Sequence, residues 1–100
     1  MNIKEFEVQN DSALISLKAM ANKYRLGILY LLTERDQSVN DLALTLELPQ
    51  PVVSQHLKVL KAADMVCFTK DGAQHSYRLD KKQLVMSAMI FKLFNIETVI

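Results

Sequence analysis

The sequence has little that would cross-link the chain, anchor it in a membrane or divide it into loops. Cys67 is the one cysteine, which excludes a disulfide within the chain and predicts a reducing compartment. No run approaches the roughly 20 apolar residues that a membrane span requires, and residues 1–10 mix charged with apolar side chains, unlike a signal peptide. Two glycines and two prolines predict mostly helical elements with short connections. We therefore expect one cytoplasmic domain over residues 1–100, without a membrane partner.

The net charge of the chain is close to zero, but the charges are unevenly distributed along it. The net charge is +1, from 12 basic and 11 acidic residues. Residues 1–49 carry a net charge of −2, whereas residues 50–82 hold six basic and three acidic side chains, a net charge of +3. A basic second half attracts phosphate, although a bias of this size is also common on solvated surfaces.

The spacing of apolar residues predicts a helical domain with one β-hairpin. Helix starts are marked by one of residues 10–12, by Asn22, and by Ser38, where Asp41 stands at the position that completes a capping box. This order, α-α-α-α-β-β-α with a glycine at the hairpin tip, predicts a winged helix-turn-helix fold, mainly α with a β-hairpin wing. The expected elements are helices over residues 12–20, 23–32, 39–46 and 50–63, strands over 65–69 and 74–79 with a turn at 70–73, and a helix over 81–95.

The fourth predicted helix has an outer face that suits DNA. Val53, Leu57 and Leu60 define its buried direction, and its other side carries no acidic residue between positions 50 and 64. Amides, hydroxyls and valine methyls can read base edges in the major groove, whereas lysines bind phosphates. The predicted base-contacting residues are Gln50, Val52, Ser54, Gln55 and His56, and the predicted backbone and wing contacts are Lys58, Lys61, Lys70, Gly72, Gln74 and Arg78.

Taken singly, each of these side chains is typical of an ordinary solvated helix face. Their combination with a helix-turn-helix order and a basic hairpin tip favours DNA binding.

The last predicted helix is apolar over most of its circumference, which is more surface than one small core needs to bury. A partner subunit is one natural cover, and completion of a monomeric core is the alternative. The predicted dimer interface comprises Leu14, Leu17, Leu84, Met86, Met89, Ile90, Phe91, Leu93 and Phe94.

Three segments of the chain, residues 21–29, 38–43 and 53–66, resemble the ArsR/SmtB family of bacterial transcriptional repressors. The Ser-Gln-His-Leu-Lys-Val-Leu run at residues 54–60 is the most specific part, and residues 70–72 and 77–79 resemble the family's wing. The resemblance covers about residues 13–95. It implies a homodimer joined through its first and last helices, with two recognition helices in successive major grooves of an inverted repeat in double-stranded DNA. It also implies an inducer that releases the DNA, which the sequence does not identify.

The residues that relatives use to sense metals are missing. Ser38 and Asn40 stand where one family site has its cysteine pair, and neither is a soft metal ligand. Residues 81–100, where a second family site uses Asp and His, contain no His and no Cys. His56, His75 and Cys67 have no ligand spacing, so we predict neither a metal nor a cofactor.

Cys67 is the remaining candidate sensor. Strand alternation turns its side chain away from those of Val66 and Phe68, so that oxidation or cross-linking there could disturb the wing. The alternative is an inert structural cysteine.

The sequence thus predicts a dimeric, sequence-specific DNA-binding regulator, a repressor. The alternative is a winged-helix protein-interaction module that does not bind DNA, and the salt dependence of DNA binding separates the two. An enzyme has no support, because no phosphate loop, Ser/His/Asp set or usefully spaced carboxylate pair is present.

Overall fold

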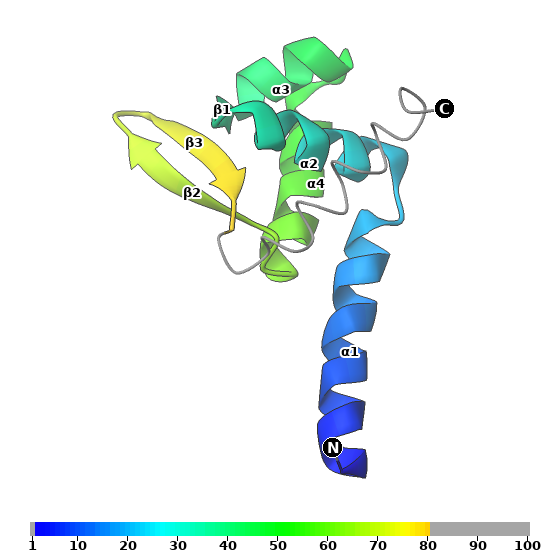
Figure 1. The fold of residues 1–100 in the computed structure, drawn as a ribbon. Coiled ribbons are helices and arrows are strands. Elements are labelled where there is room, and N and C mark those ends of the chain that lie inside the picture. Colours follow the sequence, from blue (N-terminus) through cyan, green and yellow to red (C-terminus); the bar gives the residue numbers. More distant parts are fainter. Residues whose placement is uncertain (1, 81–100) are drawn as a thin grey trace.

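The computed structural model describes residues 2–80, and for residues 6–10, 12 and 13 it describes the backbone only. The winged helix-turn-helix fold predicted from the sequence is confirmed (Figure 1). The predicted helix over residues 81–95, with seven of the predicted interface residues, lies outside the described residues. The elements are α1 (Ile3–Met20), α2 (Lys23–Glu34), β1 (Gln37–Ser38), α3 (Val39–Leu46), α4 (Gln50–Ala62), β2 (Val66–Asp71) and β3 (Gln74–Leu79).

Helix α1 is longer than predicted. It begins at Ile3 rather than near residue 12, and Asn2 rather than one of residues 10–12 is its N-cap. The Asn2 side chain accepts a hydrogen bond from the Glu5 amide at 2.9 Å, and the Glu5 carboxylate accepts one from the Asn2 amide at 3.4 Å. This reciprocal capping box starts the helix one residue after Asn2. The N-terminal part of α1 extends away from the body of the domain (Figure 1).

The predicted caps of the next two helices are confirmed. Asn22 accepts hydrogen bonds from the amides of Tyr24 and Arg25 at 2.9 and 3.1 Å, which satisfies two donors at the start of α2. The Ser38 hydroxyl accepts from the Asp41 amide at 3.1 Å and completes a capping box with it. Helices α2 and α3 therefore begin at the predicted residues, Lys23 and Val39.

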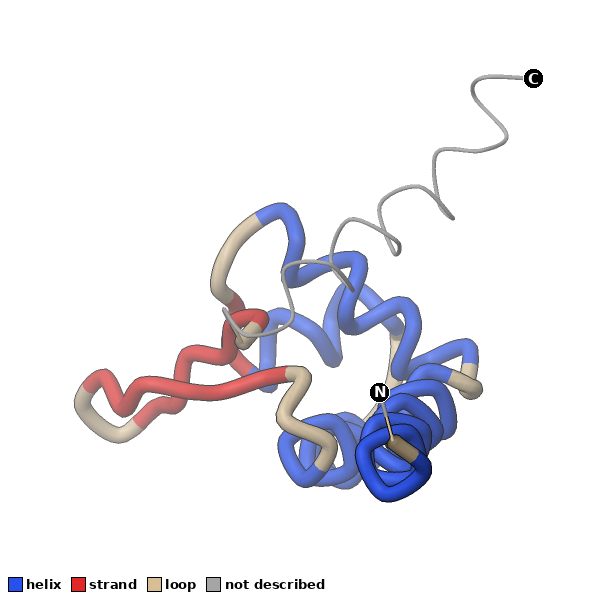
Figure 2. The backbone as a smooth tube through the Cα atoms, turned by 60° about the horizontal axis from the view of Figure 1, so that its bottom comes forward, coloured by secondary structure: helices blue, strands red, loops and turns tan. Residues whose placement is uncertain are grey.

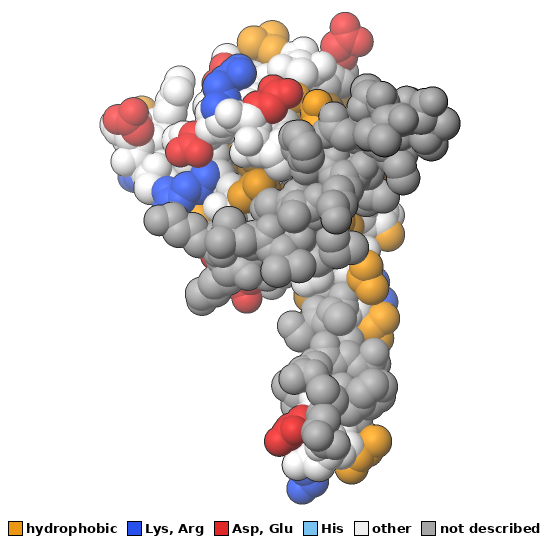
Figure 3. Space-filling model, viewed as in Figure 1, with side chains coloured by type: hydrophobic (Ala, Val, Ile, Leu, Met, Phe, Trp, Pro, Cys, Tyr) orange, Lys and Arg blue, Asp and Glu red, His pale blue; other side chains and the backbone are white. Residues whose placement is uncertain are grey.

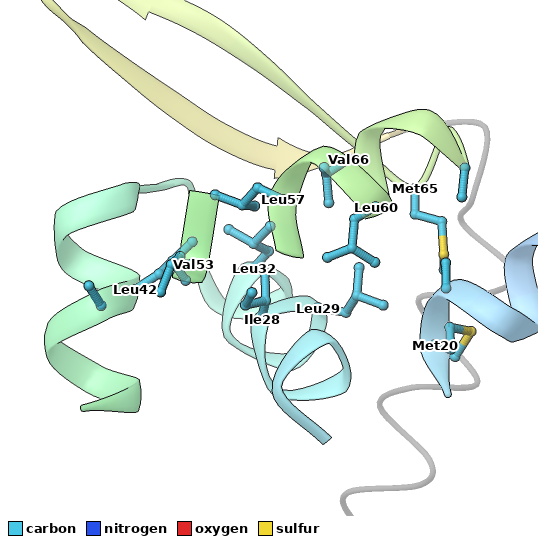
Figure 4. Close-up of a cluster of buried hydrophobic side chains, with 13 residues drawn as sticks. Met20, Ile28, Leu29, Leu32, Leu42, Val53, Leu57, Leu60, Met65 and Val66 are labelled. Atoms are coloured by element: carbon cyan, nitrogen blue, oxygen red, sulfur yellow. The ribbon is translucent and has the colours of Figure 1, made fainter. Parts of the chain in front are cut away.

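The core lies where α2, α3 and α4 meet (Figure 4). The three α4 residues predicted to face inward are fully buried, and Figure 4 shows two of them, Leu57 and Leu60, directed toward side chains of α2. The residues of this core with the largest buried side chains are Ile28, Leu29, Leu42, Val53, Leu57, Leu60, Met65 and Val66. Because α4 is fixed on this side, its opposite side is left to solvent.

A small antiparallel sheet of order β1-β3-β2 forms the wing (Figure 2). Strand β3 has the predicted bounds, whereas β2 runs from Val66 to Asp71 and leaves a tighter turn at Gly72 and Ala73. Gly72 has a φ of 63°, a left-handed conformation that glycine adopts without strain.

The sequence did not predict β1. This two-residue strand pairs Gln37 with Tyr77 of β3, and the buried Gln37 side chain donates to the Leu31 carbonyl at 2.7 Å. It fastens the base of the wing to the helices.

Candidate nucleic-acid interface

The outward side of α4 presents the residues predicted to read DNA. Gln55 and Lys58 are exposed, and Val52 and Val59 are each more than one third exposed beside them. No carboxylate occurs within α4. This surface, hereafter the α4 face, offers amide, ammonium and methyl groups to a partner without any acid that would repel phosphate.

The start of α4 has no side-chain cap. Pro49 is its N-cap, and the amides of Val52 and Val53 bond instead to the Pro49 carbonyl at 3.0 and 3.2 Å. The Gln50 amide group donates to the Asn40 side-chain oxygen at 2.9 Å, which ties the first turn of α4 to α3. Gln50 is exposed, so its carbonyl side remains accessible.

A polar cleft of about 380 Å³ lies between the first turn of α4, the start of α3 and the wing. Gln50 of α4 and Gln74 of β3, predicted separately to contact DNA, line the same cleft although 24 positions separate them. The other lining residues are Ser38, Val39, Asn40, Ala73 and His75. The fold therefore brings part of the predicted base-reading set next to part of the predicted wing set.

The remaining wing residues lie along the hairpin. Lys70 and Gly72 are exposed near its tip, and Arg78 is half-buried opposite Cys67 in the β2–β3 pairing. The Lys61 ammonium lies 4.3 Å from the centre of the Phe68 ring, a cation–π contact between α4 and the wing. Lys61 thus holds the wing against α4 in addition to any contact with phosphate.

Two predicted base-reading residues are partly withdrawn from the surface. Ser54 and His56 are half-buried. The His56 ring lies 6.0 Å from the Tyr24 ring between centroids, and its Nδ1 is 3.5 Å from a guanidinium nitrogen of Arg25. Desolvation by burial lowers the pKa of His56, and the Arg25 charge lowers that pKa further. The neutral imidazole is therefore the favoured form.

Arg25 and Tyr24 are the site residues that sequence reasoning missed. Both stand in the first turn of α2, and no local signal connects them with His56, which is 31 positions beyond Arg25. From the sequence, Asn40 is of interest only because it stands at a cysteine position of the family. The structure shows that its side-chain oxygen accepts a hydrogen bond from Gln50.

The described part of α1 carries exposed apolar side chains. Leu14 and Leu17 are 43% and 52% exposed, and Ile3, close to the same direction of the helix, is 68% exposed. Figure 3 shows apolar side chains along this protruding helix. Such a stripe on a helix that leaves the domain body is typical of a subunit interface.

Two findings concern residues 2–80 only. No group of three or more His, Cys, Asp or Glu side chains in this part of the chain could hold a metal ion. None of the helices within it is long and apolar enough to cross a membrane.

The α4 face, its buried back and the adjacent wing define a DNA-binding protein of the winged helix-turn-helix class. A sequence model described as "Bacterial regulatory protein, arsR family" matches residues 22–67. The chain belongs to this family, as the sequence predicted.

Known bacterial regulators are similar to large parts of this chain. The transcriptional activator HlyU of Vibrio cholerae is 36% identical over 95 residues, which are 94% of this chain and 88% of that protein. The repressor SmtB of Mycobacterium tuberculosis is 44% identical over 69 residues, so the match spans about half of that protein (51%) and 69% of this chain. The solved structure of reduced HlyU from Vibrio cholerae has a TM-score of 0.83 and covers 94% of this chain and 97% of its own.

Proposed function

We propose that this protein is a homodimeric transcriptional repressor that reads an inverted repeat in double-stranded DNA through the α4 face. The observation that carries the proposal is the pairing of an acid-free outer face on α4 with a fully buried back. One such helix per subunit would enter each of two successive major grooves. The exposed Leu14 and Leu17 on α1 support a second copy as the dimer partner.

Replacement of Gln55 tests base reading. Gln55→Ala removes an exposed amide from the α4 face and should cost about 1–3 kcal/mol at one base pair of the preferred site, with relaxed preference there. The measurement is a set of affinities for duplexes that differ at single base pairs.

Lys58→Ala is the matched control one turn along the same helix. It should weaken binding to all duplexes alike and reduce the slope of log affinity against log salt by about one unit. If both variants bind the preferred duplex as the parent protein does, α4 does not read DNA through this face.

The interaction-module alternative gives a different salt response. A DNA-binding regulator should lose affinity for the inverted repeat steeply between low and moderate salt, because bound lysines release counterions from the duplex. Affinity that is absent or indifferent to salt favours docking of a protein partner instead.

A redox response through Cys67 stays a hypothesis beside this proposal. The Cys67 side chain is half-buried in β2, opposite Arg78. A bulkier, oxidised side chain there would disturb the pairing of the two wing strands. We expect oxidant to weaken operator binding by the parent protein and not by Cys67→Ser. A Cys67→Ser protein that still responds to oxidant assigns the cysteine to a structural role.

A further inference from the structure

Arg25 joins three helices at a point next to the α4 face. Its Nε donates to the Ala19 carbonyl at 2.6 Å, and one terminal nitrogen donates to the Lys18 carbonyl at 3.4 Å. Both acceptors are at the C-terminal end of α1, and the Lys18 carbonyl also accepts from the backbone amide of Ala21 at 3.2 Å. The guanidinium, rooted in α2, is thereby held in place with its other terminal nitrogen facing His56 of α4.

This contact favours one tautomer of the imidazole. Arginine carries only donors and stays protonated, so the nitrogen that faces it must present a lone pair. That nitrogen is Nδ1, 3.5 Å from Arg25 Nη1. A neutral imidazole with a lone pair on Nδ1 carries its proton on Nε2, the nitrogen directed away from the arginine.

Burial of the ring, which lowers the pKa of His56, favours the same neutral form. Tyr24 offers a ring 6.0 Å away, and the Lys23 ammonium lies over that ring at 4.9 Å from its centre, which adds positive charge to this side. Within α4 itself there is no carboxylate to favour a protonated ring. Among residues 2–80, the Arg25 contact is the one hydrogen-bond contact of His56, so no residue in this part of the chain accepts from its Nε2–H.

We propose that Arg25 is a positioning residue for DNA recognition: it holds His56 as the Nε2–H tautomer, so that α4 offers a fixed N–H donor to an acceptor on the duplex. The inference rests on the proposed function. The acceptors with suitable chemistry are a base edge, such as guanine O6 or N7 or thymine O4, and a phosphate oxygen. A free histidine populates two tautomers, so binding has to select the one that donates, whereas Arg25 sets this tautomer before the duplex binds.

Nitrogen-15 NMR of the histidine rings in the full chain tests the first half of the proposal without DNA. The chain has two histidines, so the signals of the two rings are assigned before they are compared. We expect His56 to be protonated on Nε2 and to titrate below the ordinary histidine value of about 6.5. If His56 of the parent protein carries its proton on Nδ1, or titrates at or above the ordinary histidine value, the proposal is wrong.

Arg25→Gln removes the charge, and Arg35→Gln at the other end of α2 is the matched control. Arg25→Gln should raise the pKa of His56 and mix its tautomers, whereas Arg35→Gln should leave both unchanged. Equal titration of His56 in the two variants contradicts a role for Arg25. Because Arg25 also bonds to α1, thermal unfolding of both variants accompanies the titration.

Two substitutions of His56 test the donor. The amide nitrogen of glutamine can reach the place of Nε2, and that of asparagine lies nearer the place of Nδ1. We expect His56→Gln to bind the preferred duplex within about threefold of the parent, and His56→Asn to lose at least about tenfold. An equal effect of the two substitutions overturns the donor role.

The pattern of the loss identifies the acceptor. A loss confined to one base pair indicates a base edge, and an equal loss on all duplexes indicates a phosphate. If the parent protein binds no DNA, the proposed function and the donor role both fail, while the NMR result still decides whether Arg25 sets the tautomer.

Discussion

Leu57→Ala is expected to lower the free energy of unfolding by about 2–5 kcal/mol, the range for truncating a buried leucine whose surroundings relax only in part. Leu57 is 1% exposed and lies on the inner side of α4, between Val53 and Leu60 (Figure 4). A loss of this size is a large fraction of the stability of a domain of this length. The α4 face would be displaced as well, because Leu57 anchors α4 on the helices behind it.

Urea unfolding at one fixed protein concentration is the measurement, since the stability of a dimer depends on concentration. Val59→Ala on the same helix is the control. Val59 is 37% exposed, so its truncation should change the free energy of unfolding by less than about 1 kcal/mol. A Leu57→Ala protein as stable as the Val59→Ala protein would mean that the back of α4 is not anchored as described.

Leu17→Glu is expected to give the second large effect, on assembly rather than on the fold. Leu17 is 52% exposed in the single chain, so a glutamate there is tolerated by the subunit but would place a charge in an apolar contact between subunits. We expect sedimentation to show a monomer. Loss of the second recognition helix should then weaken binding to an inverted repeat by about 10²–10⁴-fold, the advantage of two linked contacts.

Leu44→Glu makes the same change at a site away from α1. Leu44 is 71% exposed on α3, and its replacement should leave the sedimentation behaviour unchanged. If Leu17→Glu remains a dimer, the described part of α1 does not contribute to the subunit interface.

Much of the fold could be predicted because its signals are local. Asn22 and Ser38 each mark a helix start with groups two or three residues away, and the spacing of Val53, Leu57 and Leu60 defines a buried face within one helix. The start of α1 was missed because its cap, Asn2, precedes a stretch with few periodic apolar residues. Strand β1 was missed because two residues carry no periodicity, and its pairing with β3 spans 40 positions at Gln37 and Tyr77.

In the candidate site too, features with local signals could be predicted from the sequence and features that depend on distant residues could not. Which α4 side chains face outward followed from helix geometry, and the structure shows Gln55 and Lys58 exposed as expected. What holds the neighbouring side chains could not be predicted, because the partners come from other elements: Asn40 for Gln50, Phe68 for Lys61 and Arg25 for His56. These contacts depend on how the helices and the wing pack against one another, and the spacing of residues within one helix does not determine that packing.

Selection of duplexes from a random DNA pool by the purified full chain tests the central claim most directly. The account predicts that the enriched sequences share two inverted half-sites separated by about one helical turn, and that Gln55→Ala selects a consensus relaxed at one position in each half. Enrichment of no common sequence, or of the same consensus by both proteins, would contradict recognition of DNA through the α4 face.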